Sequence, residues 1–159
     1  MPTRSKVEIL SRIIANLRRE LEACMMAARE ATAAATDPGS KAENKYDTRS
    51  LEASYLARGQ ALRVSELHEA VLAFETLNPR DMAPDQTITP GALVVLADKS
   101  EEDIYFLGPC AGGTSVDVDG QEILVITPAS PLGRELMGRR AGDFISLRTG
   151  AKMTIKSVS

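Results

Sequence analysis

The stretch Thr36–Asp47, TDPGSKAENKYD, separates two long segments of helical periodicity and decides how the first half of the chain folds. Pro38 and Gly39 end a helix, because proline lacks a backbone N–H and glycine readily adopts positive φ. Ser40, with Glu43 three residues later, is a capping-box pair that starts a second helix. Because so short a turn cannot return the chain to the far end of the first helix, we predict that the two helices pack antiparallel.

The segment before this turn predicts a helix from about Lys6 to Ala35, with Ser5 and Glu8 as a capping box at its start. Its apolar residues alternate spacings of three and four, which is typical of a coiled-coil seam. They shrink from Ile and Leu to Ala toward the turn, so the helices can approach closely there. The predicted seam is Val7, Leu10, Ile14, Leu17, Leu21, Cys24, Ala28, Ala31 and Ala35.

The second helix is predicted from about Lys41 to Leu77, where Asn78 and Pro79 end it. Gly59 lies inside this helix and costs about 1 kcal/mol relative to alanine. The apolar positions are less regular than in the first helix. They include Leu51, Tyr55, Leu62, Leu67, Val71, Phe74 and Leu77.

The periodicity changes from helical to strand-like after a proline-containing segment. We therefore predict a helical hairpin over residues 1–80, a linker over 81–90 and a compact domain over 91–159. Short apolar runs and turn signals predict strands near 92–97, 104–107, 114–118, 122–127, 144–147 and 152–158. Ser130 and Pro131 are expected to begin a short helix that ends near Gly138. The predicted fold class is α+β, with two domains and a mostly antiparallel sheet.

Composition excludes several classes of protein. The 159 residues carry a formal net charge of −3, which does not fit a polycationic nucleic-acid binder. No run approaches the roughly 20 apolar residues that span a bilayer, so we expect a cytoplasmic protein. Cys24 and Cys110 fall in separate regions and are expected to be reduced thiols. His68 is the only histidine, and a histidine metal site is not expected.

The carboxylates around the turn allow two interpretations. Glu43 and Asp47 are four residues apart, so both point to one side of the second helix, and Asp37 precedes the helix break. Like charges at this spacing repel by roughly 0.2–0.5 kcal/mol, and a bound Mg²⁺ would relieve that repulsion. Alternatively, the acids simply stabilise the positive end of the helix dipole.

Lys41, Lys45 and Arg49 repeat every four residues beside these acids. Such a basic stripe is suited to contacts with phosphates, for example those of an RNA. A solvated helix face gives the same pattern, and both interpretations stay open.

Two motifs resemble one known family. Glu43–Tyr46 looks like the "ENAEY"-type segment of the GreA/GreB transcript cleavage factors, at the start of the second helix of a hairpin. Ile126–Gly138, followed by Gly142–Phe144, is similar to their C-terminal "SPIARALIGKxxGD" pattern. The resemblance implies an FK506-binding-protein-like C-terminal domain without prolyl isomerase activity. It also implies that this domain docks on the rim of the secondary channel of bacterial RNA polymerase, with Ser130 and Pro131 at the docking site.

The resemblance further implies that the hairpin enters the channel, where tip carboxylates (Glu43, Asp47 and Asp37 are the candidates) act on a Mg²⁺ shared with the polymerase. Lys41, Lys45 and Arg49 would then contact the RNA 3′ end or the channel. The factor would be a monomer without a cofactor or nuclease activity of its own.

The family's tip also carries an aspartate, and its position falls on Ser40 when Glu43 is aligned. Two alternatives therefore stay open. The chain could modulate or inhibit the polymerase without stimulating cleavage. It could also be a coiled-coil interaction module without metal chemistry.

Overall fold

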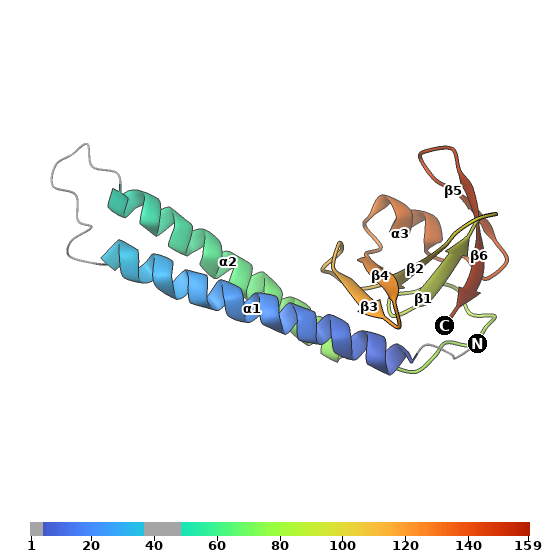
Figure 1. The fold of residues 1–159 in the computed structure, drawn as a ribbon, viewed down its shortest axis with the longest axis horizontal. Helices are drawn as coiled ribbons and strands as arrows, with labels where there is room; N and C mark the ends of the chain where they lie inside the picture. Colours follow the sequence, from blue (N-terminus) through green and yellow to red (C-terminus); the bar gives the residue numbers. More distant parts are fainter. Residues whose placement is uncertain (1–4, 37–48) are drawn as a thin grey trace. The chain divides into compact units, whose positions relative to one another are not determined.

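The computed structural model describes residues 5–36 and 49–159, and the chain forms two compact units (Figure 1). One unit is Ala15–Leu72, which contains most of the helices α1 (Lys6–Thr36) and α2 (Arg49–Glu75). The other unit combines the start of α1, up to Ile14, with Ala73–Ser159. The predicted linker at residues 81–90 stays a prediction.

Helix α1 begins at the predicted residue. The N–H of Glu8 donates to Ser5 Oγ at 3.4 Å, which is one half of the predicted capping box. The Glu8 carboxylate does not return to Ser5 but accepts two hydrogen bonds from Arg12. Helix α2 ends at Glu75, two residues before the predicted Leu77. Its predicted start at Lys41 lies outside the described residues.

The predicted seam of α1 is correct over most of its length. Leu10, Leu17 and Ala31 are buried, and Ile14, Leu21, Cys24 and Ala28 are half-buried. The side chain of Ala35 lies outside the described part of the chain. Val7 was predicted wrongly, since 58% of it is exposed. Ile9 and Ile13 are fully buried in its place, because the first turns of α1 belong to the unit that contains the sheet.

The predicted apolar face of α2 is wrong in its first half. Leu51, Tyr55 and Leu62 are 54%, 61% and 63% exposed. At this level α2 instead places the small residues Ala53 and Ala57, together with Gln60, in the half-buried positions. The observed seam alternates spacings of four and three along the whole helix. It consists of Ala53, Ala57, Gln60, Val64, Leu67, Val71 and Phe74.

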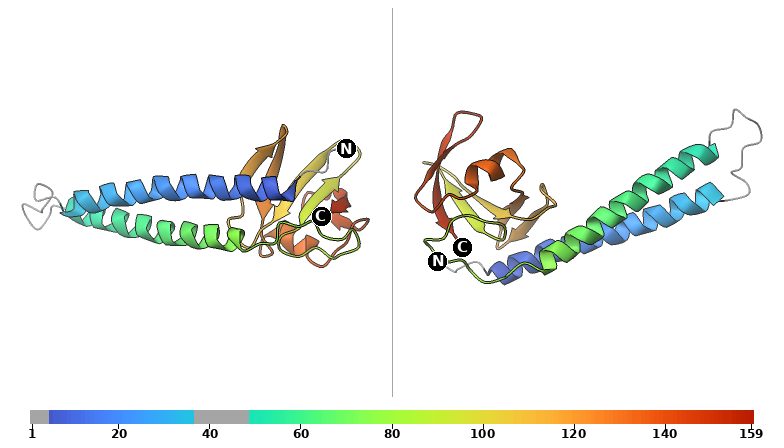
Figure 2. Two further views of the ribbon diagram at one scale, coloured as in Figure 1. Left: turned by 90° about the horizontal axis from the view of Figure 1, so that it is seen from below. Right: turned by 180° about the vertical axis from the view of Figure 1, so that it is seen from behind.

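The two helices run antiparallel and side by side within the unit Ala15–Leu72 (Figure 2). Arg63 on α2 reaches across to Glu20 on α1, with the guanidinium 2.5 Å from the carboxylate. Arg58 lies over the ring of Tyr55, 5.9 Å from its centroid. The two-helix geometry predicted from the short turn is therefore present.

The C-terminal part is a six-stranded sheet in the order β3-β4-β2-β1-β6-β5 (Figure 1). Four of its five strand pairs are antiparallel, and β2 pairs with β4 in parallel. The strands are β1 (Leu93–Ala97), β2 (Glu102–Leu107), β3 (Ser115–Val118), β4 (Gln121–Ile126), β5 (Phe144–Ser146) and β6 (Lys152–Val158). A short helix, α3 (Pro131–Leu136), follows β4. The predicted fold class, long N-terminal helices followed by a mostly antiparallel sheet with one short helix, is confirmed.

The sheet is buried on both faces. Leu107, Ile126 and Leu136 of α3 lie in one apolar cluster on one side. Alternation along β2 turns Phe106 to the opposite face, where its ring contacts Phe74 at a centroid distance of 6.2 Å. On the edge strand β3, the Asp117 carbonyl accepts a 2.8 Å hydrogen bond from the Arg12 guanidinium.

Over residues 5–36 and 49–159, no helix is both long and apolar enough to cross a membrane. Cys24 and Cys110 are half-buried and are not joined in a disulfide in the structure.

Candidate functional site

Most residues predicted to act at the hairpin tip lie outside the described residues, so their roles stay predictions. Arg49 is the first residue of α2, and its side chain is likewise not described. The tip residues concerned are Asp37, Lys41, Glu43, Lys45 and Asp47.

The C-terminal candidates, Ser130 and Pro131, lie at the start of α3. Ser130 is the N-cap, and its Oγ accepts from the N–H of Gly133 at 3.0 Å. The same hydroxyl donates to the Thr127 carbonyl at 2.7 Å. Pro131 occupies the first helical turn, where its missing N–H costs nothing, and its side chain is exposed. Ser130 therefore serves the fold through its hydroxyl, and Pro131 is the member of the pair that a partner can touch.

Gly133 fixes α3 against the end of β4. A Cβ atom at this position would lie 1.8 Å from the Thr127 carbonyl oxygen and 2.9 Å from Ser130 Oγ. No side chain fits this space, because the nearest atom belongs to the backbone. The sequence segment from Thr127 to Gly133 is thus a strand end, a capped turn and a close-packed helix start.

The loop after α3 is organised by the other part of the motif. Gly142 has a φ of 93° and donates its N–H to the Ile155 carbonyl at 2.7 Å. The Asp143 carboxylate accepts from the N–H of Arg140 at 2.9 Å. Gly142 and Asp143 therefore close the turn that leads into β5.

Between α3 and the segment after β5 lies a groove of about 320 Å³. Its apolar wall is Pro131, Leu132 and Leu147, and the charged residues Arg134, Arg148 and Glu135 line it as well, Glu135 being paired with Arg139. Neither Arg134 nor Arg148 has an ion pair or hydrogen bond to a side chain of the described residues. The groove therefore suits a partner segment that combines apolar side chains with a carboxylate.

The residues contributed from beyond β5, Leu147 and Arg148, were not among the predicted site residues. The sequence indicates these two residues only weakly, because it is the pairing of β5 with β6 that brings the turn between these strands next to α3. A prediction of the hairpin alone does not say which side of it faces the helix.

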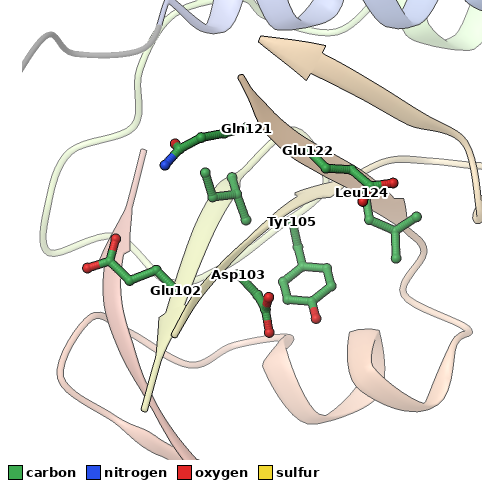
Figure 3. Close-up of a pocket in the computed structure, with 7 residues that line it drawn as sticks. Glu102, Asp103, Tyr105, Gln121, Glu122 and Leu124 are labelled. Carbon is green, nitrogen blue, oxygen red and sulfur yellow. The ribbon is translucent and has the colours of Figure 1, made fainter. Parts of the chain in front are cut away.

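A second pocket, of about 320 Å³, lies along the parallel pair β2 and β4 (Figure 3). Figure 3 shows the Tyr105 ring with Asp103 on one side and Leu124 on the other. Burial and, to a smaller extent, the neighbouring Asp103 raise the pKa of the Tyr105 phenol. Glu102 at the same pocket is held by an ion pair with Lys156.

No group of three or more His, Cys, Asp or Glu that could hold a metal ion occurs in the part of the chain that the structure describes. The predicted Mg²⁺ contacts concern tip residues outside that part.

No family model and no curated protein sequence matches this chain. Among solved structures, it is similar to GreA factor homolog 1 (Gfh1) of Thermus thermophilus, with 20% identity and a TM-score of 0.37. That match covers 92% of this chain and 94% of the other. Thermus aquaticus Gfh1 matches with 19% identity and a TM-score of 0.36, over 91% and 92% of the two chains.

The prokaryotic transcription elongation factor GreA/GreB from Nitrosomonas europaea matches with 25% identity and a TM-score of 0.34, over 64% of this chain and 79% of the other. These TM-scores indicate similarity and no more. The chain is thus similar, along most of its length, to transcription factors of the GreA/GreB type.

Proposed function

We propose that this chain is a transcription elongation factor that binds bacterial RNA polymerase and inserts its hairpin tip into the secondary channel. The observation that carries the proposal is the segment Ile126–Asp143, which combines a sequence motif similar to that of the GreA/GreB factors with a capped helix beside an open groove. The antiparallel helices α1 and α2 supply the elongated element that such a mechanism needs. Helix α1 alone has 31 residues and is therefore about 46 Å long.

The groove beside α3 is the proposed docking surface on the polymerase. Pro131 and Leu147 provide apolar contacts, and Arg134 and Arg148 provide donors for a carboxylate. Ser130 and Gly133 act indirectly, because they hold α3 in place.

The tip would act through its carboxylates. Carboxylate oxygens are the ligands that Mg²⁺ prefers, and this ion commonly takes one or two of them together with phosphates and water. Glu43 and Asp47 are the proposed ligands, and Asp37 is a third candidate. Lys41, Lys45 and Arg49 would contact RNA phosphates or the channel. The chemistry belongs to the polymerase, and this chain would supply no catalytic centre of its own.

Ser40 favours a second candidate function, in which the factor occupies the channel without stimulating cleavage. An aspartate at this position in the related family would supply one of the metal ligands, and a serine hydroxyl is a much weaker one. The two functions share the docking step and differ only at the tip.

Cleavage is tested on stalled, backtracked complexes of bacterial RNA polymerase with labelled RNA and Mg²⁺. Short 3′ fragments that appear with the wild type and disappear with Glu43→Ala support stimulation of cleavage. Glu30→Ala is the matched control, because Glu30 is an exposed glutamate elsewhere on the hairpin. Binding without fragments supports the modulator. A Ser40→Asp variant that then gains cleavage would assign the difference to this position.

Docking is tested separately by binding of the labelled factor to the core polymerase. The double change Arg134→Glu and Arg148→Glu is expected to weaken binding at least tenfold, because two guanidinium donors become repulsive carboxylates. Lys99→Glu, in the turn between β1 and β2, is the charge-change control and should bind like the wild type. If the wild type itself does not bind polymerase, the proposed function is wrong.

A further inference from the structure

A second feature of the chain, separate from the groove and the tip, is a pocket of about 380 Å³ between the start of α1 and residues 78–91. Both parts belong to the same compact unit. Lys6 lines the pocket and is only 2% exposed. Among the described residues it is the one charged side chain in the buried class. A buried ammonium is costly unless its donors are satisfied, so its surroundings are informative.

Within residues 5–36 and 49–159, one hydrogen bond from the Lys6 ammonium is found. Its Nζ donates to the Arg80 carbonyl at 3.1 Å, which uses one of three N–H groups. Burial lowers the pKa of Lys6, and the charge of Asp81 opposes this shift. Over residues 5–36 and 49–159, however, no carboxylate lies within ion-pair distance of Lys6. Two donors of a buried cation at a pocket wall thus have no partner among the described residues.

The neighbouring amides add further donors. Asn78 Oδ1 accepts from the N–H of Arg80 at 3.0 Å, and Gln86 Oε1 accepts from the N–H of Ala83 at 2.9 Å. Because each amide oxygen is already bound to the backbone, each side chain has its NH₂ group left to donate. Asn78, Arg80 and Gln86 all line the same pocket as Lys6. Its wall therefore has many donors and one acidic side chain, Asp81.

We propose that this pocket binds a small oxyanion, with the Lys6 ammonium as its principal ligand and Arg80, Asn78 and Gln86 as further donors. Phosphate fits this donor set best, because its oxygens accept hydrogen bonds from several directions at once. A carboxylate offers the same acceptor chemistry with fewer oxygens. Bound there, the anion would join the first turn of α1 to the segment that leads into β1.

The test uses the full chain and inorganic phosphate, followed by ³¹P NMR line width and by the thermal midpoint in far-UV circular dichroism. Parallel titrations with sodium acetate and sodium chloride are made at matched ionic strength. Phosphate or acetate should bind saturably and raise the midpoint, whereas chloride should not. Whichever of phosphate and acetate binds with the higher affinity identifies the kind of oxyanion that the pocket binds.

Lys6→Met keeps the length and apolar stem of the side chain and removes the charge. It should weaken oxyanion binding about tenfold or more, as expected for losing a charged hydrogen-bond donor. Lys99→Met, at an exposed lysine of the same unit, is the matched control and should bind like the wild type. If Lys6→Met does not fold, Arg80→Gln provides the second variant, with a smaller but measurable loss.

Absence of saturable binding to the wild type at tens of millimolar phosphate or acetate would overturn the proposal. Equal affinity of the folded Lys6→Met variant and the wild type would overturn it as well. An equal response to chloride would show a general ionic effect, and it too would exclude an oxyanion pocket.

Discussion

Replacing Gly133 by alanine should strongly destabilise the C-terminal sheet unit. The added Cβ would lie 1.8 Å from the Thr127 carbonyl oxygen and 2.7 Å from its carbonyl carbon. Ordinary contacts between such atoms begin near 3.4 Å. The separation must therefore grow by well over 1 Å, and neither partner is a side chain that could rotate away.

The energetic cost follows from what this movement breaks. Displacing α3 removes the hydrogen bond from the Gly133 N–H to Ser130 Oγ, which is 3.0 Å long, and loss of an N-cap costs about 1 kcal/mol. It also pulls Leu136, which is fully buried, out of its apolar cluster. Overpacking that the surroundings cannot relieve adds about 1–3 kcal/mol. We therefore expect a loss of about 3 kcal/mol or more in the free energy of unfolding.

The measurement is urea unfolding followed by far-UV circular dichroism. With a typical urea slope of 1–3 kcal/mol per molar, this loss lowers the midpoint by about 1–3 M. The matched control is Gly59→Ala in α2, where a new Cβ meets nothing within 4 Å. That change should stabilise the helix by roughly 0.5–1 kcal/mol, because alanine is the better helix former. A Gly133→Ala midpoint within about 0.3 M of the wild type would refute the packing described for α3.

Three further predictions concern charges. Burial raises the pKa of Tyr105 above its ordinary 10.0, so the stability that the protonated phenol contributes below that pH should be lost as pH rises through the pKa of the folded state. In alkaline unfolding curves, Tyr105→Phe should remove this dependence, whereas the control Tyr55→Phe, at an exposed tyrosine, should not. Arg63→Ala should lower the free energy of unfolding in urea by less than about 1 kcal/mol, and by less still in high salt, because the ion pair between Arg63 and Glu20 is exposed. A large loss of stability that does not depend on salt would contradict this. The carboxyl ¹³C shift of Asp98 should titrate below the ordinary 3.8, because the N–H groups of Ser100 and Glu101 favour its charged form, and an ordinary value would rule out that turn.

The helices show why the sequence predicts where a helix begins and ends better than it predicts which face of the helix is buried. The start of α1 at Lys6 follows from its cap, and the seam through Leu10 and Leu17 follows from the spacing. On α2, the large residues Leu51 and Leu62 suggest a face that is in fact exposed. The true seam in this half is made of alanines and Gln60, whose apolar signal is weak. Their regular spacing is present in the sequence, but it does not outweigh the apolar signal of Leu51 and Leu62.

The sequence predicts the positions of the strands well, but it predicts less well which residues surround the groove beside α3. Short apolar runs and turn residues place β1 to β6 within one or two residues of the prediction. The pairing of β2 with β4 in parallel is a long-range choice that no local pattern shows. For the same reason, Leu147 and Arg148 could not be assigned to the groove beside α3. Lys6 was predicted as the first helical residue, and its burial depends on contacts with Arg80, 74 positions away.

The C-terminal motif carries two kinds of information that its sequence alone does not separate. Ser130, Gly133 and Gly142 have contacts that explain their presence through the fold alone. A similar pattern in another protein therefore indicates a similar local structure, whatever that protein binds. Pro131 begins α3 but has an exposed side chain, and the Arg134 side chain has no partner among the described residues. Substitutions at these two outward positions thus test docking, whereas substitutions at the inward ones test only folding. The proposed difference between a cleavage factor and a modulator lies instead at Ser40 and Glu43, which are outside the described residues.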